Sequence, residues 1–171
     1  YRLTVGNNEQ IYLTTADAEP AVYADTRTYN GANRRLALFA TNAGGYRSSF
    51  TCYGLRIARC GEIVRDFMPC RAPNGEVGLW DWVSGRFFNN KGTGAFEGGD
   101  EGAARLGYLQ ATGTQYIDTG YIVKALDKVE CVVKTPASGY PATYSALFGT
   151  KYAGDETTAS GTMNQIFGFF V

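Results

Sequence analysis

Glycine recurs along this chain at intervals so short that only short structural elements fit between turns. The 171 residues include 22 glycines, and no window sustains apolar residues at helical spacing with caps at its ends. Twelve tyrosines and ten phenylalanines supply most of the aromatic content, and both residue types favour the half-buried surface of a pleated sheet. Because glycine marks turns and bulges between strands, this pattern predicts an all-β chain.

Short apolar runs bounded by turn residues predict the individual strands. We expect hairpins where run 49–58 is followed by 63–67, and where run 77–82 is followed by 86–88. Segment 69–75 contains an Asn-Gly pair and is expected to be a loop. Further runs cover residues 1–5, 10–14, 21–28, 35–41, 108–110, 115–118, 128–134, 144–150 and 165–171. Many short strands with turns between them predict a jelly-roll-like sandwich of two packed sheets.

The charge balance and the short apolar runs argue against a nucleic-acid partner and against a membrane span. Lys+Arg and Asp+Glu number 16 each, so the chain has no net charge and lacks the basic surface that nucleic-acid binding requires. The most apolar run, residues 166–171, is far shorter than the roughly 20 residues of a membrane span. We therefore expect neither nucleic-acid binding nor a membrane span.

The chain contains no histidine, which removes the commonest general base and the commonest metal ligand. A Ser-His-Asp or Cys-His site would need its histidine from a partner chain. The Gly-rich run 92–94 lacks the Lys-Ser/Thr of a phosphate loop, and the acidic residues near 97–101 and 155–156 lack the ordered spacing of a calcium site. No metal and no cofactor are expected.

Four cysteines leave two possibilities open. Their spacings match no zinc-binding or redox motif. The even number allows two disulfides with three possible connectivities, which would suit an oxidising compartment. The alternative is a set of buried free thiols. The residues are Cys52, Cys60, Cys70 and Cys131.

Two segments resemble a known family. Residues 108–121, YLQATGTQYIDTGY, are similar to the opening strand pair of laminin-G-like, concanavalin A-like sandwich domains of bacterial surface and phage-associated proteins. Residues 61–70, GEIVRDFMPC, continuing through 75–81 to SGRFF at 84–88, resemble the closing segment of the same domains. The resemblance implies an extracellular or cell-surface location, on a bacterium or its phage.

The order of the two segments is reversed relative to that family. Residues 1–104 resemble the C-terminal part of one sandwich and end in a Gly-rich linker, and residues 105–171 resemble the N-terminal part of the next sandwich, or of the same one in permuted order. Half a sandwich would leave its inner face and its strand edges uncovered. The halves therefore pair within one chain or with a neighbouring subunit, and head-to-tail pairing of the second kind can continue into a filament.

Carboxylates do not form a hydrolytic cluster in this sequence. Glucanases of the resembled superfamily carry Glu-x-Asp-x-Glu on one strand, where acid and nucleophile share a face. Here Glu62 and Asp66 are four residues apart, and Glu76 and Asp81 are five apart. We expect no enzymatic activity.

Four residues are candidates for a ligand or interface site. Trp80 and Trp82 share one face by alternation, and Trp82 replaces the polar residue usual in the family, so it is expected to be exposed near the hairpin tip. Exposed tryptophan stacks on sugar faces or anchors protein interfaces; plain packing is the alternative. Arg65 and Asp66 form the strongest polar pair of the closing segment, and either bridge to neighbouring elements or bind a ligand.

These features predict a non-enzymatic extracellular module that is a structural or adhesive repeat, with self-association or neighbouring repeats as partners. A self-assembling filament subunit with complementary sandwich halves is the form that the reversed order favours. The alternative is a lectin-like, carbohydrate-binding module, for which a glycan is the partner.

Overall fold

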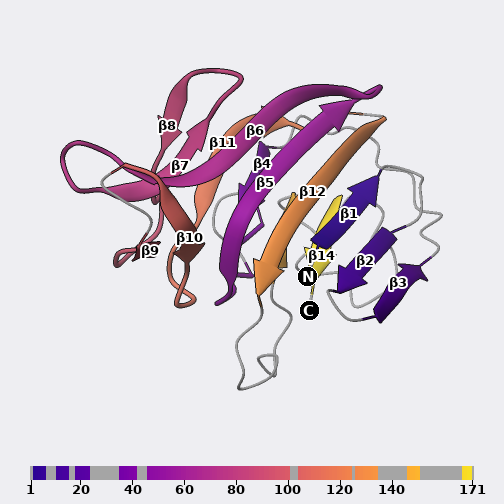
Figure 1. Ribbon diagram of the computed structural model, residues 1–171, viewed down its shortest axis with the longest axis horizontal. Helices are drawn as coiled ribbons and strands as arrows, with labels where there is room; N and C mark the ends of the chain where they lie inside the picture. Colours follow the sequence, from indigo (N-terminus) through magenta and orange to yellow (C-terminus); the bar gives the residue numbers. More distant parts are fainter. Residues whose placement is uncertain are drawn as a thin grey trace, which may run out of the picture.

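The computed structural model describes residues 2–6, 11–15, 18–23, 35–41, 46–100, 104–124, 126–134, 146–150 and 167–170. Within these ranges the secondary structure is entirely β, which confirms the fold class (Figure 1). The strands are β1 (Arg2–Gly6), β2 (Ile11–Thr15), β3 (Ala18–Tyr23), β4 (Arg35–Leu38), β5 (Thr51–Arg59), β6 (Glu62–Arg71), β7 (Val77–Asp81), β8 (Arg86–Phe88), β9 (Glu97–Asp100), β10 (Leu106–Gln110), β11 (Ile117–Ile122), β12 (Asp127–Lys134), β13 (Ala146–Thr150) and β14 (Phe167–Phe170).

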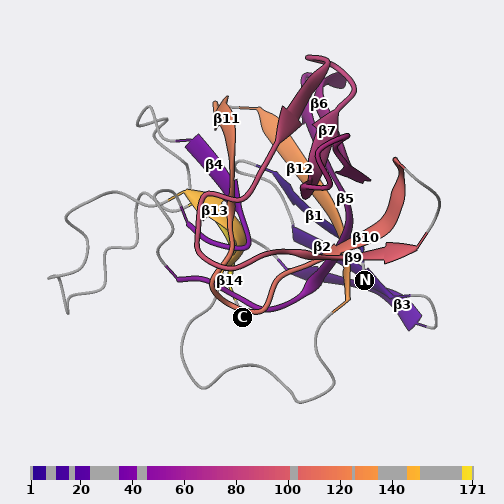
Figure 2. The ribbon, with the colours of Figure 1, turned by 90° about the vertical axis from the view of Figure 1, so that its left-hand side faces the viewer.

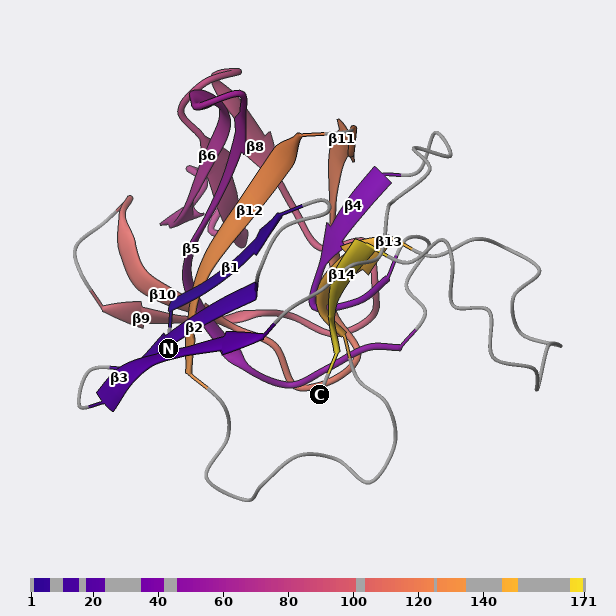
Figure 3. The ribbon, with the colours of Figure 1, turned by 90° about the vertical axis from the view of Figure 1, so that its right-hand side faces the viewer.

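The described strands form two antiparallel sheets that face each other as layers (Figures 2 and 3). The larger sheet has the order β3-β2-β1-β12-β5-β6-β7-β8, with β10 also paired to β5 and β9 to β10. The smaller sheet has the order β11-β4-β13-β14. This arrangement is an all-β sandwich of two antiparallel sheets, as the strand pattern predicted.

Alternation along the strands creates the core between the layers. In β12 every second residue, from Asp127 to Val133, is buried and the residues between them are partly or fully exposed. The opposite layer contributes Leu38 and Phe148, which are register partners on β4 and β13 and are both fully buried. Burial of this apolar surface is the main favourable contribution to folding.

Strands from before and after residue 105 pair with one another in both sheets. β12 lies between β1 and β5, and β4 lies between β11 and β13. The Gly-rich stretch expected to be a linker contains β9, which pairs with β10. The Tyr108 ring packs directly over Gly99, because a Cβ there would lie only 2.1 Å from the ring. The division into parts of successive or permuted sandwiches stays a prediction.

Strand β6 extends through part of the segment expected to be a loop. The sequence predicted a strand over 63–67, whereas β6 continues through Pro69 to Arg71 and only the residues after it turn. The β5–β6 ladder ends at the pair Leu55 and Phe67. A proline beyond that point can be accommodated because the neighbouring ladder no longer requires its missing N–H.

The β5–β6 hairpin offers a matched test of the core. Ile57 is fully buried and Ile63 is 48% exposed, although both belong to the same hairpin. We expect Ile57→Ala to lower the free energy of unfolding by about 2–5 kcal/mol, because it removes buried methyl groups and leaves a cavity. Ile63→Ala should change it by about 0.5 kcal/mol or less. Urea denaturation of both variants measures the difference, and equal losses would contradict the placement of Ile57 in the core.

Candidate functional site

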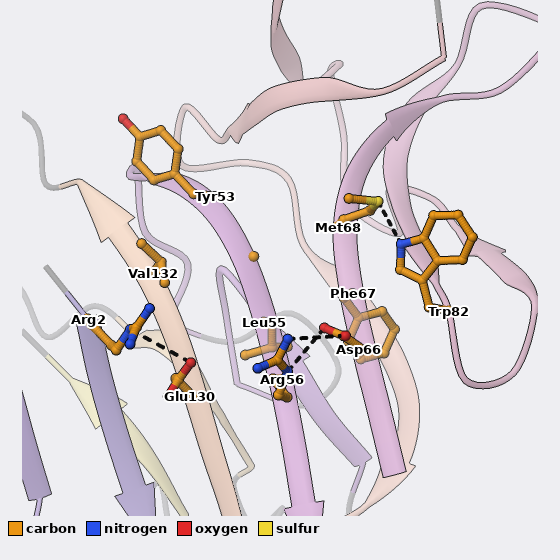
Figure 4. Close-up of a pocket in the computed structure, with 11 residues that line it drawn as sticks. Arg2, Tyr53, Leu55, Arg56, Asp66, Phe67, Met68, Trp82, Glu130 and Val132 are labelled. Carbon is orange, nitrogen blue, oxygen red and sulfur yellow. Dashed lines mark hydrogen bonds and ion pairs between the residues drawn. The ribbon is translucent and has the colours of Figure 1, made fainter. Parts of the chain in front are cut away.

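A hollow of about 290 Å³ opens on the outer face of the larger sheet, the face turned away from the smaller sheet (Figure 4). Strands β1, β12, β5 and β6 and the turn after β7 contribute to it. Its position on a continuous sheet means that backbone hydrogen bonding fixes the spacing of the lining side chains. The lining residues are Arg2, Tyr53, Gly54, Leu55, Arg56, Asp66, Phe67, Met68, Trp82, Glu130 and Val132.

A β-bulge in β5 creates the floor and one wall of the hollow. Val132 pairs with Gly54 and Val133 pairs with Cys52, so Tyr53 is the extra residue between them. Bulges redirect side chains in this way, and Tyr53 stands at the rim with 42% of its surface exposed. Gly54 places no side chain on the floor, and the nearest atom to an added Cβ would be the Phe67 carbonyl oxygen at 3.4 Å. The hollow therefore depends on glycine at this position.

Trp82 forms the opposite wall. It is 64% exposed at the β7–β8 turn, and its ring meets that of Trp80 edge-on, with centroids 6.5 Å apart. Its indole N–H donates to the sulfur of Met68. Figure 4 shows Tyr53 and Trp82 on opposite sides of the hollow. With its N–H engaged by Met68, the Trp82 side chain leaves much of its apolar ring surface exposed.

Charged side chains cross the lower part of the hollow with alternating sign. Glu130 on β12 lies 3.8 Å from Arg2 on β1. On the neighbouring strands the Arg56 guanidinium donates twice to the Asp66 carboxylate, at 3.3 and 3.4 Å. Two guanidinium groups and two carboxylates give this row no net charge. Exposed ion pairs of this kind contribute only about 0–1 kcal/mol to stability, so a ligand can share their donors and acceptors at small cost.

Arg65 and Asp66 do not form one site, because adjacent strand residues point to opposite faces. Asp66 lies on the outer face at the hollow. The Arg65 guanidinium lies 5.4 Å above the centre of the Tyr121 ring, and its Nε is 3.4 Å from a carboxylate oxygen of Asp81. Each residue thus pairs with a neighbouring element; whether either one binds a ligand stays a prediction.

Asp81 holds the turn that presents Trp82. Its fully buried carboxylate accepts hydrogen bonds from the backbone N–H of Asp66 and of Val83, and from the hydroxyl of Ser84. These bonds tie the β7–β8 turn to β6. Of the other carboxylates considered for hydrolysis, Glu62 begins β6 and Glu76 follows its far end, so the two are separated by the length of the strand.

A buried polar network at the β11–β12 turn was not anticipated from the sequence. The Asp127 carboxylate is fully buried and accepts hydrogen bonds from Arg59 Nε at 2.8 Å, the Tyr121 hydroxyl at 2.9 Å and the Lys124 backbone N–H at 2.6 Å. Arg59 and Arg65 lie over the Tyr121 ring. One feature of the sequence could have indicated the burial of Asp127. In the alternating strand β12 it falls on the same side as Val129 and every second residue after it, which is the side that faces the core.

Burial and charge shift the titration of this network. Burial, followed by the hydrogen bond to Asp127, raises the pKa of Tyr121 from 10.0 to about 12. The Asp127 carboxylate raises the pKa of Arg59. Both shifts keep Arg59 charged and Tyr121 protonated, so Tyr121 remains a hydrogen-bond donor to Asp127.

The four cysteines occupy different environments and are thiols in this structure. Cys52 and Cys131 are fully buried on neighbouring strands. Cys60 is exposed at the β5–β6 turn, and Cys70 is partly buried on β6. Among the described residues, no three His, Cys, Asp or Glu side chains gather as a metal site requires. The described part of the chain has no helix with the length and apolarity needed to cross a bilayer.

No family model, curated protein or solved structure matches this chain. The structure supports the all-β, two-sheet architecture implied by the resemblance. Membership of the concanavalin A-like or laminin-G-like family stays a prediction from the two sequence segments.

The raised pKa of Tyr121 predicts that the protein loses stability at alkaline pH. An unfolded tyrosine titrates near pH 10 and the folded Tyr121 near 12, so between these values the unfolded chain has lost a proton that the folded chain retains. The stabilisation is complete below pH 10 and is lost as the pH rises to about 12. Tyr121→Phe should be less stable at neutral pH, but its stability should fall less steeply across this window. Urea denaturation across the pH range measures both slopes; identical slopes would contradict the assignment.

Proposed function

We propose that this chain is a non-enzymatic, adhesive β-sandwich module that binds carbohydrate in the outer-face hollow. The observation that carries the proposal is the placement of exposed Trp82 and Tyr53 on opposite sides of a 290 Å³ hollow that contains ion-paired polar groups. The laminin-G-like resemblance supports the same class of module. A location on a bacterial surface or phage particle is proposed from that resemblance alone.

The chemistry of the hollow fits a sugar. Aromatic side chains combine a large apolar face with defined geometry, and the apolar C–H face of a pyranose ring can stack on such a surface. Ring hydroxyl groups need acceptors and donors around their edges, which Asp66, Glu130 and Arg56 provide. Binding sites commonly combine apolar walls with a few placed polar groups. The hollow has this composition.

The charge balance favours a neutral sugar over a polyanion. The charged row contains Arg2, Glu130, Arg56 and Asp66, which sum to zero. A polyanionic glycan would need an excess of guanidinium or ammonium groups, because unpaired like charges cost free energy when they are brought together. We therefore expect neutral hexose polymers to bind better than sulfated or uronic-acid polymers.

Two variants test the hollow directly. Trp82→Ala removes one wall, and Gly54→Leu fills the floor without requiring an unusual backbone conformation. On a glycan array and by calorimetry with the best array ligand, each should weaken binding by about tenfold or more, the loss expected of an anchoring residue. Val83→Ala is the matched control, since Val83 neighbours Trp82 and is 50% exposed but does not line the hollow.

An array without signal for the wild-type chain would argue against carbohydrate binding. Binding that survives both Trp82→Ala and Gly54→Leu would place the ligand elsewhere on the molecule. Thermal unfolding of each variant separates a lost contact from a lost fold.

Self-assembly is the second candidate, and the outer edge of the smaller sheet favours it. In the described part of the chain β14, with the apolar sequence FGFF, is paired on one side only, to β13. A strand edge with free N–H and C=O groups can pair with another chain. A filament built from neighbouring modules would use such an edge.

The assembly state tests this second candidate. Regular filaments in negatively stained samples, together with a mass that increases with concentration in light scattering, would favour β14-mediated assembly. Compact particles with the mass of one chain at all concentrations would contradict it and leave ligand binding as the function.

A further inference from the structure

Two buried cysteines face each other beneath the hollow. The sulfur atoms of Cys52 on β5 and Cys131 on β12 lie 3.9 Å apart, and both residues are fully buried. They are not direct register partners, since Cys52 pairs with Val133 and Cys131 with Leu55. The bulge at Tyr53 brings this diagonal pair together on the inner face.

Strand geometry separates the other pairs. Cys60 and Cys52 are eight residues apart, with most of β5 between them, and at about 3.3 Å per residue this is roughly 26 Å. Cys60 and Cys70 lie near opposite ends of β6. Cys70 and Cys131 are on strands with β5 between them, so they are about 9.5 Å or more apart. Disulfides need Cα atoms within about 7 Å.

Cys60 follows Arg59, the register partner of Asp127, so it lies about four residues, roughly 13 Å, along β12 from Cys131. The last pair, Cys52 and Cys70, lies on strands separated by β10 and on opposite faces of the sheet. β10 pairs with Cys52 through Leu109, and it bridges to Cys70 through Arg105. Cys70 shares the outer side of β6 with Met68, which lines the hollow, whereas Cys52 faces the core. Of the three connectivities open from the sequence, none is therefore formed in full.

We infer that Cys52 and Cys131 form a single disulfide when the chain folds in an oxidising environment, and that Cys60 and Cys70 remain thiols. The bond joins β5 to β12 and closes a loop between positions 79 residues apart. It lies directly under the bulge that shapes the hollow. This inference does not depend on the proposed carbohydrate binding.

The chemistry balances by thiol–disulfide exchange. One thiolate attacks oxidised glutathione and releases reduced glutathione, and the second thiolate then displaces the bound glutathione. Two S–H bonds are lost, one S–S bond forms, and the oxidant leaves as two molecules of reduced glutathione. The two electrons and two protons removed from the protein end on glutathione.

Burial determines when this reaction occurs. Desolvation raises the pKa of the Cys131 thiol well above its ordinary value, and the thiolate is the reactive form. Glutathione cannot reach sulfur atoms that are fully buried. We therefore expect the bond to form during folding, and the folded, fully reduced protein to oxidise slowly.

The experiment uses the whole chain, unfolded and reduced, and then refolded with or without a glutathione redox buffer. Alkylation in denaturant should count four thiols in the reduced wild type and two after redox refolding. The double variant Cys60→Ser/Cys70→Ser should lose both of its thiols. Peptide mapping should find the link between Cys52 and Cys131, and urea unfolding should show the unfolded population reduced by about 30-fold or more.

Cys131→Val is the matched control, because valine fills a similar apolar volume without a thiol, and it should retain its three thiols after redox refolding. If the double variant refolds with native tryptophan fluorescence and keeps both thiols, the inference is wrong. A dominant link through Cys60 or Cys70, within one chain or between chains, would also overturn it. These readouts involve no glycan, so their failure is separate from failure of the proposed function.

Discussion

The antiparallel ladder between β5 and β12 is the interaction on which the rest of this structure depends. It runs from the pair Asp127 and Arg59 to the pair Lys134 and Thr51. One side of the ladder faces the core with apolar residues, and the other side carries Arg56 and Glu130 at the hollow. β12 also pairs with β1, so the ladder joins segments that are distant in the sequence. Loss of this pairing would divide both the larger sheet and the candidate site.

The bulge in β5 creates the irregular outer surface on which the hollow lies. A regular strand would place one residue opposite each residue of β12, and the outer surface would then be evenly covered by side chains. The extra residue moves Tyr53 to the rim and places Gly54 opposite Val132. The same irregularity brings Cys52 and Cys131 together on the inner face. One local departure from regular pairing thus affects both faces of the sheet.

Two buried carboxylates organise the turns of the sandwich. An isolated buried charge is costly unless hydrogen bonds and opposite charge surround it. Asp81 receives its bonds from the turn that carries Trp82, and Asp127 receives its bonds from Arg59, Tyr121 and the turn before β12. Each carboxylate therefore requires one loop conformation. The exposed ion pairs of the hollow differ in kind, because solvent weakens them and leaves them open to a ligand.

Local features of the sequence were sufficient for the all-β class and for the two hairpins, because alternation and turn residues act over a few neighbouring positions. The exposed position of Trp82 was predicted because it replaces a residue that is usually polar in the resembled family, near the hairpin tip. Other features required the tertiary structure. Pro69 lies within a strand because the adjacent ladder ends before it, and the Gly-rich stretch holds β9 because it pairs with β10, whose Tyr108 ring packs over Gly99.

The candidate site was likewise predictable from the sequence only in part. Aromatic and charged residues of the right kind were visible in the sequence, and strand alternation already separates Arg65 from Asp66. The partners that these two side chains meet, Tyr121 for Arg65 and Arg56 for Asp66, depend on the strand pairing. The approach of Cys52 to Cys131 depends on the register of two strands and on one bulge. The sequence by itself determined the type of strand and turn, which are local properties. Register, bulges and burial were decided by the tertiary structure, because they arise from contacts between residues far apart in the chain.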